Sequence, residues 1–484
     1  MKSDHPSSQS GGGGGATSST PKLRRKWLYR TLWALLVLIA SPCIYWYWCR
    51  HVALAERDAL VAEIHARGEP VWWHEVVEKA EREQPEDNGA ELFVKAIDVI
   101  GGVNASKKIL FGGDLAEAFG DQFPEPKVVP EAQQQLHLAT SAISLSNQAV
   151  QRKPGLISIL RNYDPNRTSL PHVTGSRGIH RMLRWEAFDA LALNDPRRAF
   201  RAMELGLRCA EQLSAEPLIL TQFVRLSNRS VTCHALWNCL AYSCPNEVEF
   251  RVIDGLLAAH DDGFGIDAAL VGERAIQLGM LEDDIALRNL TTNWAMTEAR
   301  HLRGSEAWMR DAWVEVLSTP LATPIRLRTE TELLRMVESS REFNDRPNVD
   351  PESEQRLVKE FERRSPLHQS LESPRSFHMG WLSGSQRMWV QAHQRLIFTR
   401  LALRLRRHYD KHGRFPEKLD ELCDAAMPKI RIDWFQNHPI VYKPTAKGFH
   451  LEVPEASVPS WEREHLKQTP LRTEYGLEFE LRSK

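Results

Sequence analysis

The chain has 484 residues and a formal net charge of −1, because its 62 lysines and arginines nearly balance its 63 aspartates and glutamates. This balance excludes the overall basic surplus that is typical of DNA-binding domains, so we expect no nucleic-acid partner. Hydrophobic residues make up 42% of the chain and charged residues 26%, as in ordinary globular proteins, and the length allows two or three domains.

Residues 1–21 are rich in serine and glycine and include an unbroken glycine run from Gly11 to Gly15. Such a segment has too few apolar residues to fold. We therefore predict a disordered tail, and the orientation argued below places it in the cytoplasm.

Residues 22–50 are predicted to form a basic flank and a transmembrane helix. The 19 residues from Thr31 to Cys49 carry no charge, and 16 of them are apolar or aromatic. As a helix they extend roughly 28 Å, which is close to the thickness of the hydrocarbon core of a bilayer. The stretch is therefore long enough to cross a membrane once.

The charges on either side of this span predict its orientation. In the 20 residues that follow it, the basic residues are Arg50, Arg57 and Arg67, whereas five crowd the segment before it: Lys22, Arg24, Arg25, Lys26 and Arg30. The positive-inside rule then places the N-terminus in the cytoplasm and the bulk of the chain outside a bacterial inner membrane. The aromatic run at 45–48 is expected to lie at the outer interface.

Three other interpretations of this stretch compete with an anchor. A cleaved signal peptide has a shorter apolar core, of about 7–15 residues, and a cleavage site made of small residues. Cys43 could be the acylated cysteine of a lipoprotein, but Pro42 beside it argues against that. The basic cluster and the aromatic flank disfavour a buried helix of a soluble protein. We therefore predict a single uncleaved anchor.

Residues 51–336 are predicted to form a helical extracytoplasmic domain. Gly68-Glu69-Pro70 is expected to end a stalk that continues the membrane helix, and Asp87-Asn88-Gly89 is expected to cap a later helix, which Gly101-Gly102 ends. Residues 101–130 are loop-like. In this part of the domain, apolar spacing predicts helices over 51–67, 72–82, 90–100 and 131–151.

The strongest helical block spans residues 172–242, where apolar side chains recur in three stripes at helical spacing. Asn194-Asp195-Pro196 predicts a tight turn with proline at the first position of the next helix. Helices joined by such short turns lie antiparallel, so we predict stacked helical hairpins of tetratricopeptide-like geometry. A strict period of about 34 residues is absent, so a true repeat array is not predicted. Further helical patterns cover 246–260, 265–288 and 292–318.

The character of the sequence changes in its last third. Residues 337–366 are dominated by charge and are predicted to be a linker or an exposed face. Residues 367–484 are predicted to form a long helix plus a small antiparallel sheet. The long helix covers 386–412, a short helix covers 416–422, and strand periodicity covers 439–442, 449–453 and 477–481. The predicted fold class is thus mainly α, with one transmembrane helix before the hairpin stack and a small α+β unit after it.

Seven cysteines are too few for a disulfide scaffold. Cys43 and Cys49 lie in or beside the predicted span, and the others lie outside it: Cys209, Cys233, Cys239, Cys244 and Cys423. An odd number implies at least one free thiol or an intermolecular bond, and the sequence leaves the pairing open. No spacing typical of a zinc site occurs. We expect most of these cysteines to be small buried thiols in helices.

Four segments carry a recognisable pattern: Ala66-Arg67-Gly68-Glu69-Pro70, Glu86-Asp87-Asn88-Gly89-Ala90, Ala215 to Arg225, and Tyr409 to Leu422. Together they resemble a group of uncharacterised bacterial proteins in which one N-terminal span precedes a helical extracytoplasmic region. The last segment is also similar to the helix-Gly-x-x-Pro-x-x-Leu step before the small sheet of type II secretion pseudopilins. The resemblance implies this architecture and no particular activity.

Two properties of pseudopilins do not carry over to this chain. Pseudopilin-like sheets often have an acidic end loop that binds calcium, but residues 454–476 contain scattered glutamates and no aspartate. The anchor also lacks a prepilin cleavage signal, which argues against a pilus subunit. We therefore expect no metal site in this unit.

Motifs of common catalytic and nucleotide-binding sites are absent from the sequence. It contains no His-Glu-x-x-His, P-loop, Gly-x-Gly-x-x-Gly or Gly-x-Ser-x-Gly. The segment Gly380-Trp381-Leu382-Ser383-Gly384 has the wrong spacing for a nucleophile elbow. We therefore predict no catalytic, cofactor-binding or metal-binding residues.

Four polar groups have both a functional and a structural interpretation, and the structural one is favoured for each. His74-Glu75 fits an exposed helix face better than an acid/base pair. Glu273-Arg274, in an apolar context, fits a structural salt bridge better than the wall of a pocket. Arg225 and Arg229 are expected to pair with acidic residues on the next helix rather than with an anionic ligand. His234 is expected to be a core histidine rather than a ligand.

These observations favour a structural or interaction role at the cell envelope, with protein partners that contact the helical body. The alternative is an extracytoplasmic enzyme, such as a hydrolase, with its site between the helical region and the C-terminal α+β unit. The two differ in what a structure must show. A deep pocket with convergent polar groups favours the enzyme, and a shallow groove with scattered polar groups favours interaction.

Overall fold

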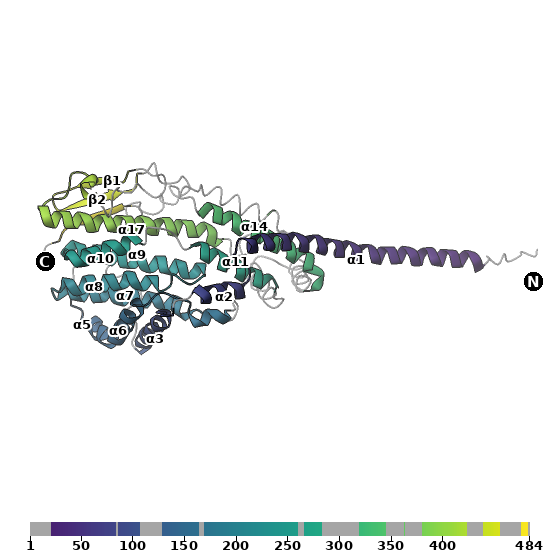
Figure 1. Ribbon diagram of the computed structural model, residues 1–484, viewed down its shortest axis with the longest axis horizontal. Coiled ribbons are helices and arrows are strands. Elements are labelled where there is room, and N and C mark those ends of the chain that lie inside the picture. The colour runs from purple at the N-terminus through teal and green to yellow at the C-terminus, as the bar shows by residue number, and fades with distance from the viewer. Residues whose placement is uncertain are drawn as a thin grey trace, which may run out of the picture.

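The computed structural model describes residues 21–83, 86–106, 128–163, 169–259, 266–282, 319–344, 363, 380–423, 439–454 and 476–482. This part of the chain is mainly helical, with one apolar helix at the N-terminus and a small three-stranded sheet near the C-terminus (Figure 1). The predicted mainly α class with a small C-terminal sheet is thereby confirmed.

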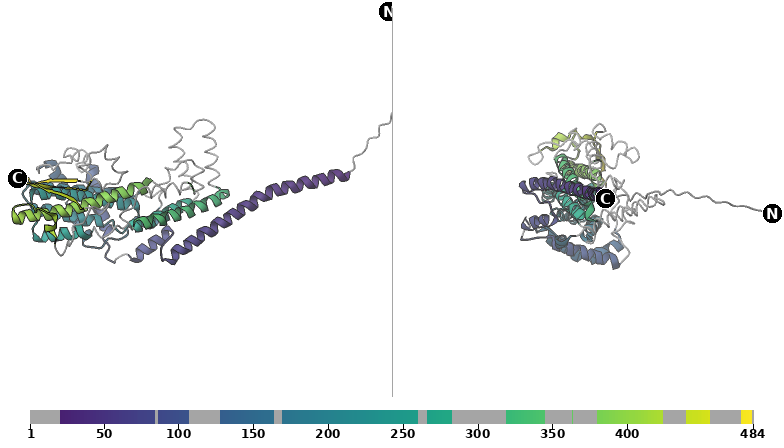
Figure 2. Two further views of the ribbon diagram at one scale, coloured as in Figure 1. Left: turned by 90° about the horizontal axis from the view of Figure 1, so that it is seen from above. Right: turned by 90° about the vertical axis from the view of Figure 1, so that its right-hand side faces the viewer.

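The N-terminal helix α1 is continuous from Pro21 to Ala66. The predicted span and stalk therefore form one helix of 46 residues, roughly 69 Å long. Its first half projects from the body, and its last turns pack against helix α14 (Thr323–Asn344) (Figures 1 and 2). Gly68, at a φ of 74°, takes the left-handed conformation that ends α1 where the sequence predicts.

The body consists of helices stacked in layers. Figure 1 shows α3, α5 and α6 along one edge, then α7 and α8, then α9 and α10, and α17 beside the sheet at the opposite edge. The helices of the body, besides α14, are α2 (Trp73–Glu83), α3 (Ala90–Ser106), α5 (Pro130–Leu138), α6 (Thr140–Val150), α7 (Pro171–Ala192), α8 (Pro196–Glu211), α9 (Ile219–Tyr242), α10 (Glu247–Ala259), α11 (Ile266–Glu282) and α17 (Gly380–His412). Short 3-10 turns are η1 (Ser158–Asn162), η2 (Pro320–Ala322) and η3 (Leu419–Leu422).

The turn between α7 and α8 forms as predicted. Asn194 takes a positive φ of 62°, which asparagine tolerates better than most residues. The Asp195 carboxylate accepts a hydrogen bond of 3.1 Å from the backbone N–H of Arg198, and Pro196 occupies the first position of α8. Helices α7, α8 and α9 pack on one another, so the block predicted at 172–242 forms one packed unit.

The small sheet and α17 share a core with the central helices. Strands β1 (Val441–Pro444), β2 (Gly448–Glu452) and β3 (Gly476–Glu480) pair antiparallel in the order β1-β2-β3. Phe449 stacks on Phe479 with ring centroids 4.7 Å apart. Farther in, the indole N–H of Trp237 in α9 donates to the Thr399 hydroxyl of α17 at 2.8 Å. Helix α17 and the sheet therefore share one hydrophobic core with helices α7 to α10.

Several predicted boundaries are wrong. Helix α3 continues through Gly101-Gly102 to Ser106, because among the described glycines only Gly68 and Gly413 take the positive φ that ends a helix. The helix predicted over 131–151 breaks at Ala139, where the Thr140 hydroxyl donates to the His137 carbonyl at 2.8 Å. The short helix predicted over 416–422 is limited to η3.

The charged segment predicted at 337–366 also begins later than expected. Helix α14 extends to Asn344, and Val337 is buried in the core that α14 forms with α1 and α11. The apolar spacing of this buried face was not recognised in the sequence, because charged residues surround it. The tail at 1–20, the helical pattern at 292–318 and residues 345–362 lie outside the described part of the chain.

Helix α11 approaches the chain at Pro217 so closely that it requires glycine at position 272. A Cβ there would lie 1.7 Å from the Pro217 carbonyl oxygen, whereas a Cβ at Gly279, in the same helix, would meet nothing within 4 Å. We expect Gly272→Ala to lower the free energy of unfolding by about 1–3 kcal/mol through overpacking. Gly279→Ala should raise it by up to about 1 kcal/mol through helix propensity. Urea unfolding of both variants checks this, and equal stabilities would contradict the close approach.

Candidate functional site

The N-terminal half of α1 is the most exposed apolar surface of the described chain. From Lys26 onward α1 is long and apolar enough to span a membrane, and little of its apolar window is buried against the body. Large apolar side chains at least half exposed occur on every side of it: Trp27, Leu28, Tyr29, Leu32, Trp33, Leu35, Leu36, Val37, Leu38, Ile39, Ile44, Tyr45, Tyr47 and Trp48. A helix that is apolar all round is suited to a bilayer or to a protein core.

The opposite end of α1 is held to the body around Arg274 of α11, whose side chain is 0% exposed. Its guanidinium pairs with the Glu338 carboxylate of α14 and donates to the Pro70 carbonyl at 2.7 Å. Glu69 lies 3.8 Å from the same guanidinium. We call Arg274, Glu69, Pro70 and Glu338, together with Arg67, the junction network.

Arg67 closes the junction network from the end of α1. Its guanidinium pairs with Glu338 and, at 3.3 Å, with Glu69, so each carboxylate is shared by two arginines. The network therefore joins three segments that are distant in sequence: the turn after α1, α11 and α14. Charged groups buried in this way are stable only while every partner is present.

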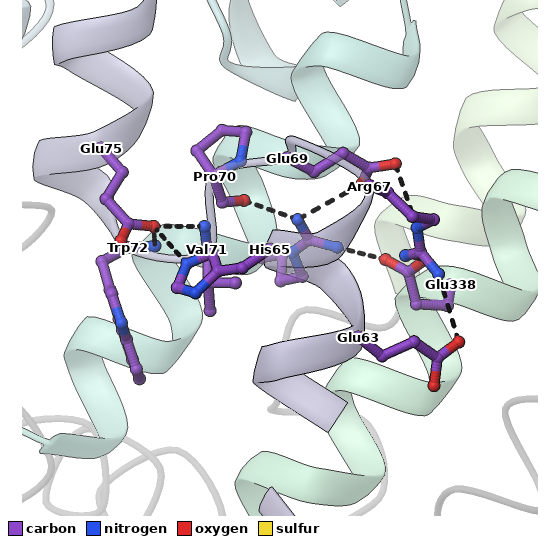
Figure 3. A network of polar contacts seen from close by, with 10 residues as sticks. Glu63, His65, Arg67, Glu69, Pro70, Val71, Trp72, Glu75 and Glu338 are labelled. Carbon is purple, nitrogen blue, oxygen red and sulfur yellow. Dashed lines mark hydrogen bonds and ion pairs between the residues drawn. The ribbon is translucent and has the colours of Figure 1, made fainter. Parts of the chain in front are cut away.

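A second carboxylate fixes the chain just after the turn. Glu75 accepts hydrogen bonds from the backbone N–H groups of Val71, at 2.7 Å, and Trp72, at 3.1 Å, and contacts His65 at 3.1 Å (Figure 3). Burial opposes the charge of Glu75, but these hydrogen bonds outweigh burial and lower its pKa. Glu75 therefore caps α2. His74 is exposed, as predicted, whereas Glu75 is half-buried against the preceding turn and does not lie on the predicted exposed face.

Arg274 forms a structural salt bridge, as predicted, but its partners are Glu338 and Glu69 rather than the predicted Glu273. Glu273 accepts a hydrogen bond from Gln277 at 3.2 Å. Adjacent residues of a helix point in different directions, so the partner of Arg274 has to come from another segment. That partner lies 64 residues away along the chain.

The pairing favoured for Arg225 and Arg229 is confirmed, although the acidic partner lies on the preceding helix. Both guanidiniums contact the Glu211 carboxylate at the end of α8, at 2.5 Å each. His234 is only half-buried and lies beside Trp237, with ring centroids 5.7 Å apart. Neither group forms a ligand site in the described part of the chain.

Three buried histidines were missed by sequence reasoning: His172, His180 and His393. His172 contacts the buried Glu216 carboxylate at 3.1 Å, and Thr221 donates to the same oxygen at 2.9 Å. His180 lies between the carbonyls of Ser176 and Gly206, and burial lowers its pKa. The apolar positions around His180 at helical spacing are the only sequence signal for it.

The cysteines are free thiols. Cys209, Cys233 and Cys239 are buried in helices α8 and α9, as expected for most of them, and burial raises the pKa of the Cys233 thiol to about 11. Cys244 is half-buried and Cys423 is exposed. Thiols with a raised pKa are poor nucleophiles, so Cys209, Cys233 and Cys239 are structural.

A cavity of about 590 Å³ lies between α10 and the C-terminal half of α17, with Leu422 of η3 in its wall. We call it the basic cavity. Its lining contains Phe250, His408 and His412, two carboxylates, Glu247 and Asp254, and five cations: Arg251, Arg400, Arg404, Arg407 and Lys411. Five cations minus two carboxylates leave a charge of +3 with the histidines neutral. Sequence reasoning missed this group, although four of the cations recur at helical spacing on α17.

The two carboxylates of the basic cavity are both held by arginines. Asp254 is bound by Arg404, at 2.6 Å, and by Arg400, at 3.1 Å. Burial raises the pKa of Asp254, but the two guanidiniums more than compensate and hold it below its ordinary value. Glu247 pairs with Arg407 and Arg251, and the hydrogen bond from Arg407 is the main cause of its lowered pKa. Carboxylates held in this way are poor general bases.

Within the described residues, no group of three or more histidine, cysteine, aspartate or glutamate side chains is placed to hold a metal ion. Comparison of the chain with models of protein families, with curated proteins and with solved structures gives no match. The resemblance to single-span bacterial proteins and to pseudopilins therefore stays a prediction.

The junction network predicts that Glu338 contributes far more to stability than the exposed Glu81 of α2. Glu338→Ala leaves the buried Arg274 guanidinium without its closest carboxylate, so we expect a loss of about 3–5 kcal/mol in the free energy of unfolding. Glu81→Ala removes the partner of Arg161 from an ion pair of 2.8 Å in which both side chains are exposed, and should cost less than about 1 kcal/mol. Chemical denaturation of both variants measures the difference, and similar losses would contradict the role of the network.

The ion pairs of Asp254 with Arg400 and Arg404 should make the stability of the protein depend on pH. Because the pKa of Asp254 is lowered by folding, its stabilising contribution is complete above its unfolded-state pKa of about 3.9 and is lost as the pH falls through the folded-state value. Asp254→Asn should therefore be less stable near neutral pH and lose less stability on acidification. Urea unfolding between about pH 3 and pH 7 measures both slopes. Asp410→Asn, at an exposed position of α17, is the control, and parallel slopes for Asp254→Asn and the wild type would refute the prediction.

Proposed function

We propose that the protein is a single-pass membrane protein of the bacterial cell envelope, with a structural or interaction role. The observation that carries the proposal is α1, because one continuous helix has an apolar exposed half and a half docked into the body. Pro42 inside this helix fits the proposal, since membrane spans tolerate proline better than soluble helices do.

The orientation rests on the flanking charges. Basic residues crowd the N-terminal edge of the apolar half, which supports a cytoplasmic N-terminus and an extracytoplasmic body at the inner membrane. Trp46, in the aromatic run at 45–48, donates from its indole N–H to the Leu321 carbonyl of η2 at 2.7 Å. Leu321 is 68% exposed, so this part of the body is suited to touch the membrane interface.

The junction network supports a scaffold role because it leaves no flexible linker between the anchor and the body. We further propose that α7, α8 and α9 form stacked hairpins of tetratricopeptide-like geometry that contact protein partners at the envelope. Their short connection at Asn194–Pro196 and their mutual packing support this geometry. Helical-hairpin stacks present extended surfaces suited to such contacts.

The alternative, an extracytoplasmic enzyme such as a hydrolase, has one observation in its favour. The basic cavity lies where that hypothesis requires a site, between the helical region and the C-terminal unit. Its carboxylates are engaged by arginines, and its described lining contains no serine, threonine or cysteine to act as a nucleophile. The lining thus favours binding over hydrolysis.

The apolar half of α1 predicts firm membrane attachment. The full chain should remain in the membrane fraction after an alkaline wash that removes peripheral proteins. Leu36→Arg combined with Ile39→Arg should release it, because each arginine near the centre of a span costs about 2.5–3.5 kcal/mol of insertion free energy. Glu56→Arg, on the exposed surface of α1 beyond the apolar stretch, is the matched control and should not change the distribution.

Two results would contradict the proposal. Release of the wild-type chain by the wash would rule out a spanning helix. A C-terminal reporter enzyme that is active only in the cytoplasm would rule out the orientation while leaving the anchor intact. The scaffold role is tested separately by crosslinking in intact cells, where it requires an envelope protein that is recovered reproducibly with the full chain.

A further inference from the structure

We propose that the basic cavity binds a small polyanion whose charge is carried by phosphate or carboxylate groups. The inference rests on the residues that line the cavity. Binding of an anion depends neither on the placement of α1 in a membrane nor on the scaffold role, so each can fail without the other. Only the source of the ligand, a dissolved anion rather than a lipid headgroup, rests on the proposed membrane placement of α1.

The first argument is the arrangement of charge on α17. Arg400, Arg404, Arg407 and Lys411 follow one another at intervals of four, three and four residues, so they share one face of the helix. Like charges at these intervals destabilise a helix unless anions compensate them. Helix α10 supplies only two carboxylates to this face, and Lys411 makes no ion pair with any residue that the structure describes.

The second argument is the difference between the inner and outer parts of the cavity. At the inner part Asp254 is saturated, since Arg400 and Arg404 each direct two N–H groups to its carboxylate. At the outer part Glu247 takes one N–H group from Arg251 and one from Arg407. A guanidinium has five N–H donors in a planar fork that matches phosphate and carboxylate oxygens. The outer arginines therefore keep most of their donors for a ligand.

The third argument is that one outer arginine is held in position. The Arg407 guanidinium lies 3.9 Å from the centre of the Phe250 ring, and its Nη2 group donates to the Glu247 carboxylate. Stacking on an aromatic ring orients the planar fork and lowers the entropy that ligand binding has to overcome. A cavity of about 590 Å³ accommodates a small molecule rather than a polymer.

The position of the cavity indicates where the ligand comes from. Helix α10 and the C-terminal half of α17 lie at the end of the body opposite the projecting half of α1 (Figures 1 and 2). Headgroups of a bilayer that surrounds α1 are therefore remote from the cavity. This placement favours a dissolved polyanion over a lipid of the same membrane.

The test uses the full chain in a neutral detergent, with sodium pyrophosphate and trisodium citrate as probes in isothermal titration calorimetry. We expect saturable binding of at least one probe that weakens as sodium chloride is added. Lys411→Gln and Arg251→Gln, at exposed positions, should each raise the dissociation constant about tenfold, because each removes a charge-assisted hydrogen bond. Glu247→Gln should tighten binding, because it removes a competing carboxylate and raises the lining charge from +3 to +4.

The tightening by Glu247→Gln is decisive, because a residue with a purely structural role would not strengthen ligand binding when it is lost. Arg208→Gln is the control for Arg251→Gln, since both arginines pair with a glutamate one helical turn away. Lys443→Gln on β1 is the control for Lys411→Gln. Binding of pyrophosphate alone, or of citrate alone, assigns the ligand to the phosphate or the carboxylate class.

Three results would overturn the proposal. The first is the absence of saturable heat with both probes. The second is equal weakening by the cavity variants and their controls. The third is weaker binding by Glu247→Gln while its melting temperature matches that of the wild type.

Discussion

Arg274 carries a positive charge on a side chain that is 0% exposed, and an unpaired ion in such a position costs several kcal/mol. The fold is therefore stable only when the three partners of Arg274 are placed around its guanidinium. Glu69 and Pro70 have to follow the end of α1 at the left-handed Gly68, and Glu338 has to lie on the facing side of α14. If the chain left α1 in another direction, the buried Arg274 guanidinium would lose Glu69 and Pro70 as partners. The direction of this turn is therefore coupled to the packing of α11 and α14.

Because of this constraint, α1 is attached rigidly to the helical body. A span joined to its domain by a flexible linker lets the domain tumble, whereas the last turns of α1 are fixed by ion pairs at Arg57 and Arg67 and by the buried Ile64. The Trp46 contact with Leu321 fixes the helix again, about three turns before Arg57. Any orientation of α1 in a bilayer would thus be transmitted to the whole helical body.

Local sequence signals predicted those features whose causes are local. The length of α1 follows from its composition, the turn at Asn194–Pro196 from three residues, and the strands from their two-residue period. Features set by distant partners were not predictable. Gly101 does not end α3 because nothing forces a positive φ there, and Arg274 finds its carboxylate 64 residues away rather than at its neighbour Glu273. The basic cavity was missed because the cations on α17 form a cavity only together with α10, and the sequence does not show that these two helices pack side by side.

A net charge of −1 does not argue against an anion site, because the total charge of a chain and the local field at a site are different quantities. Coulomb interactions between exposed groups fade over about 8–10 Å in physiological salt, so a ligand responds to the residues that line its site and not to the sum over the chain. The basic cavity concentrates an excess of +3 beside the apolar core of α10 and α17, where screening is weaker than in bulk water. A net charge of −1 is therefore fully compatible with a compact polyanion site.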